Sequence, residues 1–313
     1  MPFKHIPVMV NEVLRYMDCQ RGKIYVDCTL GGAGHSKAIL GKIIPDGMLI
    51  GIDQDEDAIE NAKNVLKPFA ANTRLFHDNF IHFPDVLSQL NIPAVDGILL
   101  DLGISLHQLE SSGRGFSFKR NEPLDMRMDK NSSPTAEEVI NRLDEGALRK
   151  IFHEYGEERW ARRIAKQIVK ARSLERIRSS RQLARIVLDA VPGGSPSQRI
   201  HPATRVFMAI RIEVNRELEN LDRFMKNAVD YLNDKGRLCI LSFHSLEDRI
   251  VKRRIKALEK GCVCPPDFPK CVCNKKQLAI SLSRKAVRPS GAEVRANPMA
   301  RSAKLRAMEK ISI

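Results

Sequence analysis

A glycine-rich segment near the N-terminus could bring the backbone against a ligand. It reads Asp27-Cys28-Thr29-Leu30-Gly31-Gly32-Ala33-Gly34-His35 and follows an apolar run typical of a buried strand. Glycines let the chain turn tightly from strand to helix at the carboxyl edge of a parallel sheet. In the G-x-G-x-x-G pattern of NAD-dependent dehydrogenases, the glycine after Gly32 and Gly34 would stand at position 37, which is Lys37. The dinucleotide fingerprint is absent, and this argues against a dehydrogenase.

Two carboxylates follow predicted strands at the same edge. Asp53 comes 22 residues after Gly31 and ends the apolar run MLIGID. A carboxylate in that place can accept hydrogen bonds from both ribose hydroxyls of an adenosine ligand, although a solvated carboxylate at a strand end is the alternative. Asp101 ends the run DGILLD, where it could act on a substrate or simply cap the following loop. The pattern predicts a nucleotide-type cofactor.

Four cysteines lie close together near the C-terminus, as Cys262-x-Cys264 and Cys271-x-Cys273. Four thiolates could close a tetrahedral zinc site, but C-x-C pairs are tighter than the usual C-x₂₋₄-C spacing. We therefore predict a loop of reduced thiols without a metal, with a structural zinc site as the alternative. The total of seven cysteines is odd, and this disfavours a disulfide framework.

These side chains need a parallel sheet to position them. The first third of the chain alternates between strand and helix patterns, which indicates a sheet covered on both faces. Strands are predicted at Lys23–Thr29, Met48–Asp53, Arg74–His77 and Asp96–Asp101, and helices at Ser36–Ile43 and Glu56–Leu66. Alternation returns with a long helix at Thr204–Leu232, a strand at Arg237–Phe243, a basic helix, and strands near Leu278–Ser283 and Ser302–Met308.

The region between these two parts lacks the alternation. Residues 103–131 are rich in Gly, Ser and charge and predict an ordered loop; Pro134 and a Thr135-x-x-Glu138 capping box then open a helix. Further helices are predicted around Trp160–Val169 and at Ser180–Ala190. The expected architecture is a doubly wound α/β core of residues 1–105 and 200–313, with an all-helical insert of residues 106–199.

Charge distinguishes this insert from the rest of the chain. The protein has 52 Lys and Arg against 38 Asp and Glu, a net charge of +14, and residues 142–185 hold 13 basic and 6 acidic residues. An excess of this kind favours a polyanionic partner, although solvated surface charge is the alternative. Arg162, Lys166 and Lys170 are spaced by four and would form one exposed row on a helix. We predict that this row binds the phosphate backbone of a nucleic acid.

Other features exclude several classes of protein. No stretch approaches the length of a membrane span, and the first residues, MPFKHIPVMVNEVL, lack the apolar region of a signal peptide. A cytoplasmic protein is expected. With 43% hydrophobic and 29% charged residues the chain reads as globular rather than disordered.

Several motifs together resemble the MraW (RsmH) family, from His5 to Lys310. They are GGAGHS, IDQDEDAI, LLDLGIS, RGFSF, PLDMRMD, YGEERWARRIA, HPATRVFMAIRI, SFHSLEDRIVK and ANPMARSAKLRA. The resemblance implies a class I S-adenosylmethionine-dependent methyltransferase that modifies the exocyclic N4 of a cytidine in the decoding centre of 16S rRNA. Its partner would be small-subunit rRNA or the assembled small ribosomal subunit. The resemblance further implies cofactor contacts at Ala33, Gly34, His35, Asp53, Phe80, Asp101 and Gln108.

Methylation of a cytosine amine needs an acceptor for its N–H bonds, because the nitrogen lone pair is delocalised into the ring. Enzymes that methylate amines in DNA usually carry an Asn/Asp/Ser-Pro-Pro-aromatic tetrapeptide after the fourth strand. This chain has Asp101-Leu102-Gly103-Ile104 instead. Asp101 is our first candidate acceptor and His244, in Ser242-Phe243-His244-Ser245, is the second; a structural role in the turn is the alternative for His244. A non-catalytic RNA-binding protein is the alternative function.

Overall fold

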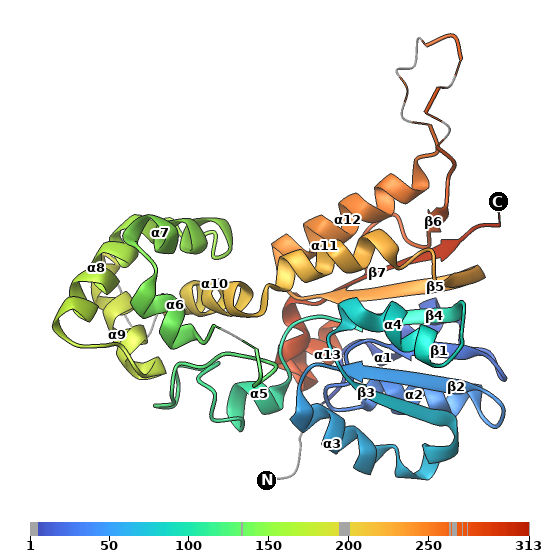
Figure 1. Ribbon diagram of the computed structural model, residues 1–313, viewed down its shortest axis with the longest axis horizontal. Coiled ribbons are helices and arrows are strands. Elements are labelled where there is room, and N and C mark those ends of the chain that lie inside the picture. The colour runs from blue at the N-terminus through green and yellow to red at the C-terminus, as the bar shows by residue number, and fades with distance from the viewer. Residues whose placement is uncertain are drawn as a thin grey trace. The chain divides into compact units, whose positions relative to one another are not determined.

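The computed structural model describes residues 6–132, 134–193, 201–262, 264, 268–270, 272–273 and 275–312. Its described residues separate into two compact units, which we call the core unit and the helical unit (Figure 1). The core unit contains the chain up to Gly103 and from Leu218 onward, and the helical unit is Ile104–Glu217. The sequence analysis places residues 200–217 in the core, whereas the structure groups this segment with the helices.

A single sheet of seven strands organises the described part of the core unit. The strands are β1 (Ile24–Asp27), β2 (Met48–Asp53), β3 (Thr73–His77), β4 (Val95–Asp101), β5 (Leu232–Ser242), β6 (Ala279–Ser281) and β7 (Lys304–Lys310). Their order is β3-β2-β1-β4-β5-β7-β6. Strands β1 to β5 pair in parallel, and β7 runs antiparallel to both of its neighbours. This confirms the predicted doubly wound α/β sheet.

Helices cover both faces of this sheet because successive strand residues point to opposite sides. In β4, Ile98 and Leu100 pack with α4 (Phe83–Gln89), α11 (Glu217–Asn227) and α12 (Ser245–Glu259), whereas Leu99 packs with the opposite layer. That layer contains α1 (Val10–Met17), α2 (Gly34–Ile43) and α3 (Glu56–Val65). Figure 1 shows α11 and α12 along one side of the sheet. The short helix α13 (Gly291–Ala296) precedes β7.

The helical unit has a hydrophobic core of its own. Its helices are α5 (Leu106–Glu110), α6 (Ala136–Arg142), α7 (Glu145–Glu154), α8 (Ala161–Leu174), α9 (Ser180–Ala190) and α10 (Ala203–Asn215). Ile140, Phe152, Ile164 and Ile210 belong to one cluster of buried side chains that draws only on this unit. The predicted capping box of α6 is present, because Thr135 and Glu138 each bind the other's backbone N–H. Among the described residues, no helix is long and apolar enough to cross a membrane.

The predicted long helix Thr204–Leu232 is wrong. It is interrupted at Arg216, which has a left-handed φ of 49°, so α10 ends at Asn215 and α11 begins at Glu217. The Asn215 side chain donates to the Met126 carbonyl (2.8 Å) and accepts from the Met128 N–H (2.8 Å). Arg211 pairs with Glu217 through two nitrogen–oxygen distances of 2.7 and 2.8 Å. These side-chain contacts stabilise the break, which apolar periodicity does not reveal.

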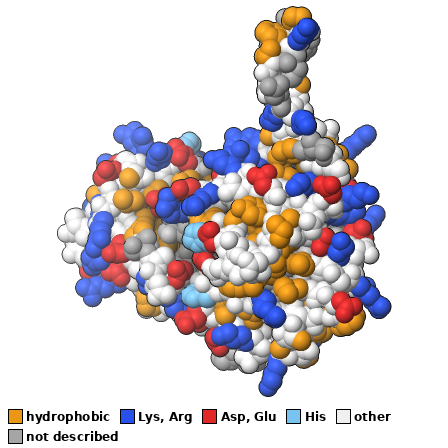
Figure 2. All heavy atoms as spheres, turned by 45° about the vertical axis from the view of Figure 1, so that its right-hand side comes forward, with side chains coloured by type: hydrophobic (Ala, Val, Ile, Leu, Met, Phe, Trp, Pro, Cys, Tyr) orange, Lys and Arg blue, Asp and Glu red, His pale blue; other side chains and the backbone are white. Residues whose placement is uncertain are grey.

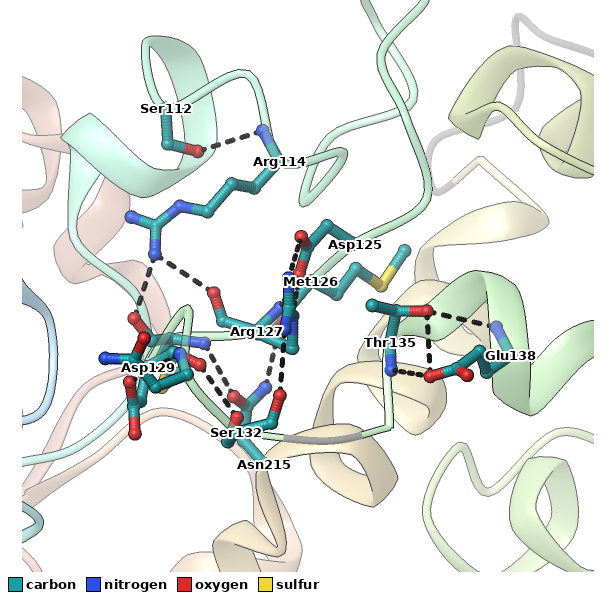
Figure 3. A network of polar contacts seen from close by, with 12 residues as sticks. Ser112, Arg114, Asp125, Met126, Arg127, Asp129, Ser132, Thr135, Glu138 and Asn215 are labelled. Carbon is teal, nitrogen blue, oxygen red and sulfur yellow. Dashed lines mark hydrogen bonds and ion pairs between the residues drawn. The ribbon is translucent and has the colours of Figure 1, made fainter.

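The predicted loop of residues 103–131 contains the short helix α5, and its remaining part, with RGFSF and PLDMRMD, is ordered by polar contacts (Figure 3). Buried Arg114 donates to the carbonyls of Arg127 (3.0 Å) and Met128 (2.9 Å). Asp125 accepts from Arg127 through both carboxylate oxygens, at 2.7 and 2.8 Å. A loop can be buried only where its backbone polar groups find such partners. This network holds the loop against the end of α10.

Candidate active site at the carboxyl edge of the sheet

The site lies where the chain order of the sheet reverses. Strands β1 and β4 are neighbours there, with β2 and β3 on one side and β5 on the other. In open α/β sheets, ligands bind in the crevice outside the carboxyl ends of the strands at such a switch point. Asp27, Asp53 and Asp101 are the last residues of β1, β2 and β4. The structure therefore brings the predicted Asp53 and Asp101 to one edge and adds Asp27.

The glycine-rich turn joins β1 to α2 with two residues of left-handed backbone. Gly31 has φ 46°, and Ala33, which precedes the first turn of α2, has φ 60°. A Cβ on Gly31 would meet no atom within 4 Å, so its backbone borders open space. A Cβ on Gly34 would instead lie 2.6 Å from a side-chain carbon of Pro7. Gly34 thus permits close packing within the protein, and its predicted contact with a cofactor stays a prediction.

Asp53 fastens the end of β2 to this turn. Its carboxylate accepts from the Gly31 N–H (2.9 Å) and from the Asp55 N–H (2.9 Å). Burial raises the pKa of Asp53 to about 6. A carboxylate has about four acceptor positions, so two N–H donors leave acceptor capacity for ligand hydroxyls.

Asp27 is a functional candidate that the sequence analysis missed. Its fully buried carboxylate accepts from the Ser36 hydroxyl (2.6 Å) and the Thr29 N–H (3.2 Å), one on each side of the glycine turn. Burial raises the pKa of Asp27 to about 7. Its position at a strand end, directly before the glycines, was the available signal. These two hydrogen bonds of Asp27 stabilise the conformation of the turn.

Asp101 carries an unusual carboxyl group. Its Oδ1 is buried and has no hydrogen-bond partner among the residues that the structure describes. Its backbone N–H donates to the Thr29 hydroxyl at 2.6 Å. Burial, followed by the nearby charges of Asp27 and Glu247, raises the pKa of Asp101 well above its ordinary value. An unpartnered buried acceptor is costly in a folded protein, so this oxygen is suited to receive a ligand's N–H or O–H.

His35 lies beside Asp101. Its Nδ1 is 3.5 Å from Asp101 Oδ2, and its Nε2 is 2.8 Å from the carbonyl oxygen of Val8. A carbonyl oxygen only accepts, so Nε2 carries a hydrogen, and Nδ1 of the neutral ring is an acceptor facing Asp101. The pair can therefore hold one proton between Asp101 and His35.

Phe80 and Gln108 both have structural contacts. The Phe80 ring is 7% exposed and meets the Phe224 ring edge-on, with the ring centroids 5.6 Å apart. Gln108 belongs to the helical unit, where its Oε1 accepts from the Ser105 N–H (2.9 Å) and closes the capping box of α5. Contacts of these residues with a cofactor stay predictions.

His244 forms the N-cap of α12. Its Nδ1 accepts from the Glu247 N–H (3.4 Å), and its Nε2 is 3.1 Å from Glu247 Oε1. The buried Glu247 also accepts from the backbone N–H groups of Phe243 (2.7 Å) and His244 (3.2 Å). These contacts are the ones expected of a histidine with a structural role in the turn. The buried Nε2 of His244 makes no hydrogen bond to the described residues, and a catalytic role for His244 stays a prediction.

The basic row predicted on the insert lies on α8. Arg162, Lys166 and Lys170 are exposed, whereas Ile164 and Ile168 on the other face of the helix are fully buried. In the described part of the chain, none of the three basic side chains has an ion-pair partner. Figure 2 shows Lys and Arg side chains along the outer margin of the helical unit, with acidic side chains between them. The row is free to meet a polyanion.

Several basic residues of the core unit are neutralised by carboxylates. Asp248 pairs with both Lys304 (3.0 Å) and Arg306 (2.7 Å), and Asp222 pairs with Arg254 (2.6 Å). Arg254 lies on α12, and Lys304 and Arg306 belong to β7. Lys252, Arg253 and Lys256 on α12 remain exposed. The charge available for RNA in the core unit is thus smaller than the sequence suggests.

Comparisons with known proteins identify the family of this chain. The family model of the MraW methylase family matches residues 2–311. A ribosomal RNA small subunit methyltransferase H from Desulforapulum autotrophicum is 55% identical over 307 residues, covering 98% of both chains. Proteins of the same name from Desulfosudis oleivorans (53% identical, 99% of this chain and 100% of the relative) and Halothermothrix orenii (47%, 98% and 99%) also match. On this evidence the chain belongs to the MraW methylase family.

Proposed function

We propose that this protein methylates the exocyclic N4 amine of a cytidine in the decoding centre of 16S rRNA. The relatives are named for ribosomal RNA of the small subunit, and they match over almost the whole chain. The observation that carries the chemistry is Asp101, whose buried Oδ1 lacks a partner within the described residues at the switch point of the sheet. The substrate is the rRNA itself or the assembled small subunit.

The cofactor is S-adenosylmethionine, and the residues at this edge fit it. When bound, it supplies an electrophilic methyl group on a positively charged sulfur. Asp53 retains acceptor capacity for the ribose hydroxyls, and the open space at Gly31 allows the backbone of the turn to meet the ligand. We assign further contacts to Ala33, Gly34 and His35 in the turn, Phe80 after β3, Asp101, and Gln108 on α5.

Asp101 is the group that activates the amine. Its unpartnered Oδ1 can accept one amine N–H, which draws the nitrogen toward a geometry with an available lone pair. A raised pKa makes the carboxylate a stronger base for the amine proton, and His35 Nδ1, 3.5 Å away, can share that proton. Asp101 must be ionised before reaction in order to accept this proton.

The helical unit contributes RNA binding. Arg162, Lys166 and Lys170 present three unpaired charges along α8, and phosphates are the anions that such a row would meet along an RNA strand. This role explains why residues 142–185 hold a surplus of seven positive charges.

The proposal is tested by incubating the protein with methyl-labelled S-adenosylmethionine and unmodified small subunits, followed by nucleoside analysis. We expect the label in N4-methylcytidine. Label in any other nucleoside would contradict the proposed atom. Binding of both RNA and cofactor without any transfer would instead support the alternative, a non-catalytic RNA-binding protein.

A further inference from the structure

Three cysteine sulfurs gather in the segment that joins α12 to β6. The Sγ atoms of Cys262, Cys264 and Cys273 all lie within 4.8 Å of one another, and those of Cys262 and Cys273 are 3.7 Å apart. Figure 1 shows the described parts of this segment beyond the end of α12. All three are thiols rather than members of a disulfide bond. Cys271, the fourth cysteine of the sequence motif, lies outside the described residues.

Backbone amides point at two of these sulfurs. The Cys264 N–H donates to the Cys262 sulfur at 3.4 Å, and the Val272 N–H donates to the Cys264 sulfur at 3.5 Å. Hydrogen bonds from N–H groups stabilise a negatively charged sulfur, and such outer contacts orient the ligands of metal sites. A metal-bound cysteine is a thiolate, and both N–H groups lie where they can donate to such a sulfur.

The large apolar side chains of this loop that the structure describes lie at its surface. Phe268 is 51% exposed and Val272 is 69% exposed, so the large apolar side chains described in this loop do not form a core. Short segments without a hydrophobic core are commonly stabilised by a disulfide or by a structural metal. Because these cysteines form no disulfide, the metal is the remaining candidate of the two.

We propose that Cys262, Cys264 and Cys273 provide three of the four ligands of one structural zinc ion, the fourth being a solvent molecule or a side chain outside this group. Zinc prefers tetrahedral sets of thiolates, and soft sulfur ligands disfavour magnesium and calcium. The sequence analysis predicts no metal, because the C-x-C spacing is tight. In the structure, Cys273 lies beside Cys262 and Cys264. The spacing of the cysteines along the sequence does not reveal that they are close together. The site lies outside the proposed catalytic edge and does not depend on the proposed reaction.

The test uses the full-length protein, purified under reducing conditions and titrated with zinc and then with cobalt. We expect about one zinc per chain and, with cobalt, the absorption bands of a tetrahedral thiolate complex. X-ray absorption should show sulfur neighbours at about 2.3 Å from zinc. Absence of stoichiometric zinc in the wild-type protein, or a zinc shell containing only nitrogen and oxygen, would overturn the proposal.

Variants provide the matched control. Cys264→Ser should weaken zinc binding by more than the roughly 10- to 100-fold that removal of an outer hydrogen bond costs. Cys19→Ser, which removes a thiol from the core unit, should leave zinc affinity unchanged. Calorimetry with S-adenosylmethionine reports whether each variant is folded. Full zinc affinity in a folded variant that lacks all three thiols would contradict the site, and the cobalt spectrum of the wild-type protein tests it without any substitution.

Discussion

At the scale of single residues, the candidate site depends on three carboxylates that end strands and have different partners. Asp53 and Asp27 each accept two hydrogen bonds, and both fasten the glycine turn. Asp101 instead has one oxygen near His35 and one with no partner in the described residues. A buried polar atom without a partner is disfavoured unless a ligand supplies one. This difference separates residues that shape the site from the residue that acts on the substrate.

Asp101→Asn should lower kcat much more than it lowers affinity for S-adenosylmethionine. The amide is nearly isosteric, but it cannot take the amine proton. We expect the rate of the wild-type protein to rise with pH as Asp101 ionises, because the pKa of Asp101 is raised. The residual rate of the variant should not rise in this way. Single-turnover rates at several pH values, with calorimetry for the cofactor, provide the measurement. Equal losses in rate and affinity would make Asp101 a cofactor-binding residue only.

Asp53→Ala should weaken binding of S-adenosylmethionine by roughly 2 to 4 kcal/mol, because the variant has no charged acceptor for the ribose hydroxyls. Glu56→Ala, which removes an exposed carboxylate from α3, is the control and should bind normally. Calorimetry measures both affinities, and thermal unfolding shows whether the core unit survives. An unchanged affinity in folded Asp53→Ala protein would remove Asp53 from the cofactor site.

Asp27 should make the stability of the ligand-free protein depend on pH. Its pKa is raised from 3.8 to about 7, so the folded state binds more protons than the unfolded state between these values. The contribution of Asp27 to the free energy of unfolding is therefore largest below about pH 4. This contribution falls as the pH rises to about 7. The decrease is on the order of 2 to 4 kcal/mol.

Urea unfolding of the wild-type protein and Asp27→Asn from pH 5 to pH 8 checks this sign. The asparagine keeps hydrogen-bonding groups for Ser36 and Thr29 but does not titrate, so the variant should gain stability relative to the wild type as pH rises. A stability difference that is constant across this range would show that Asp27 does not titrate there.

At the scale of elements, the packed residues and the basic residues of α8 lie on different faces of the helix. One face of the helix enters the core of the helical unit through Ile164 and Ile168, and the exposed face carries Arg162, Lys166 and Lys170. Because i and i+4 positions share one face of a helix, substitutions in the basic row leave the packed face untouched.

Replacing Arg162, Lys166 and Lys170 by Glu should weaken RNA binding and leave cofactor binding intact. The slope of log K against log salt should shrink by roughly 0.7 for each phosphate of a single-stranded RNA that the variant no longer binds. The matched control reverses three exposed lysines at the amino edge of the core unit, Lys42, Lys67 and Lys235. If both triple variants bind RNA alike, α8 contributes only to net charge.

At the scale of the whole molecule, each unit buries its own core. The buried side chains of the helical unit form one cluster drawn from residues 116–214, and the sheet of the core unit separates two other clusters. A separate core is the physical requirement for independent folding. Polar contacts such as those of Arg114 and Asn215 close the loop within the helical unit itself (Figure 3).

The fragment 104–217 should therefore fold without the rest of the chain. We expect helical circular dichroism with a cooperative thermal transition, and RNA binding weaker than that of the full chain but still dependent on Lys166. Asn215→Ala in the fragment should lower its stability by about 1 to 3 kcal/mol, because the Met126 carbonyl and the Met128 N–H lose their partner. A fragment that unfolds without cooperativity would show that its cluster is insufficient.

The sequence by itself determined the sheet and its catalytic edge. Periodicity identified β1 to β5, and the residues that end strands followed directly, because parallel strands place their last residues at one edge. Motifs along the chain were also sufficient to indicate the family. The exposed row on α8 could be predicted because helical spacing is local.

Only the tertiary structure decided what depends on residues distant in sequence. Helix α10 ends at Asn215, whose side chain binds a loop almost ninety positions earlier in the sequence. Lys304 and Arg306 both pair with Asp248, which neutralises their charges. The Asp27 carboxylate binds residues on both sides of the glycine turn, and Asp101 Oδ1 has no partner within the described residues. The tertiary structure also brought Cys273 to Cys262. Burial and pairing are properties of the packed chain, so a carboxylate's pKa and a cation's availability are set only after folding.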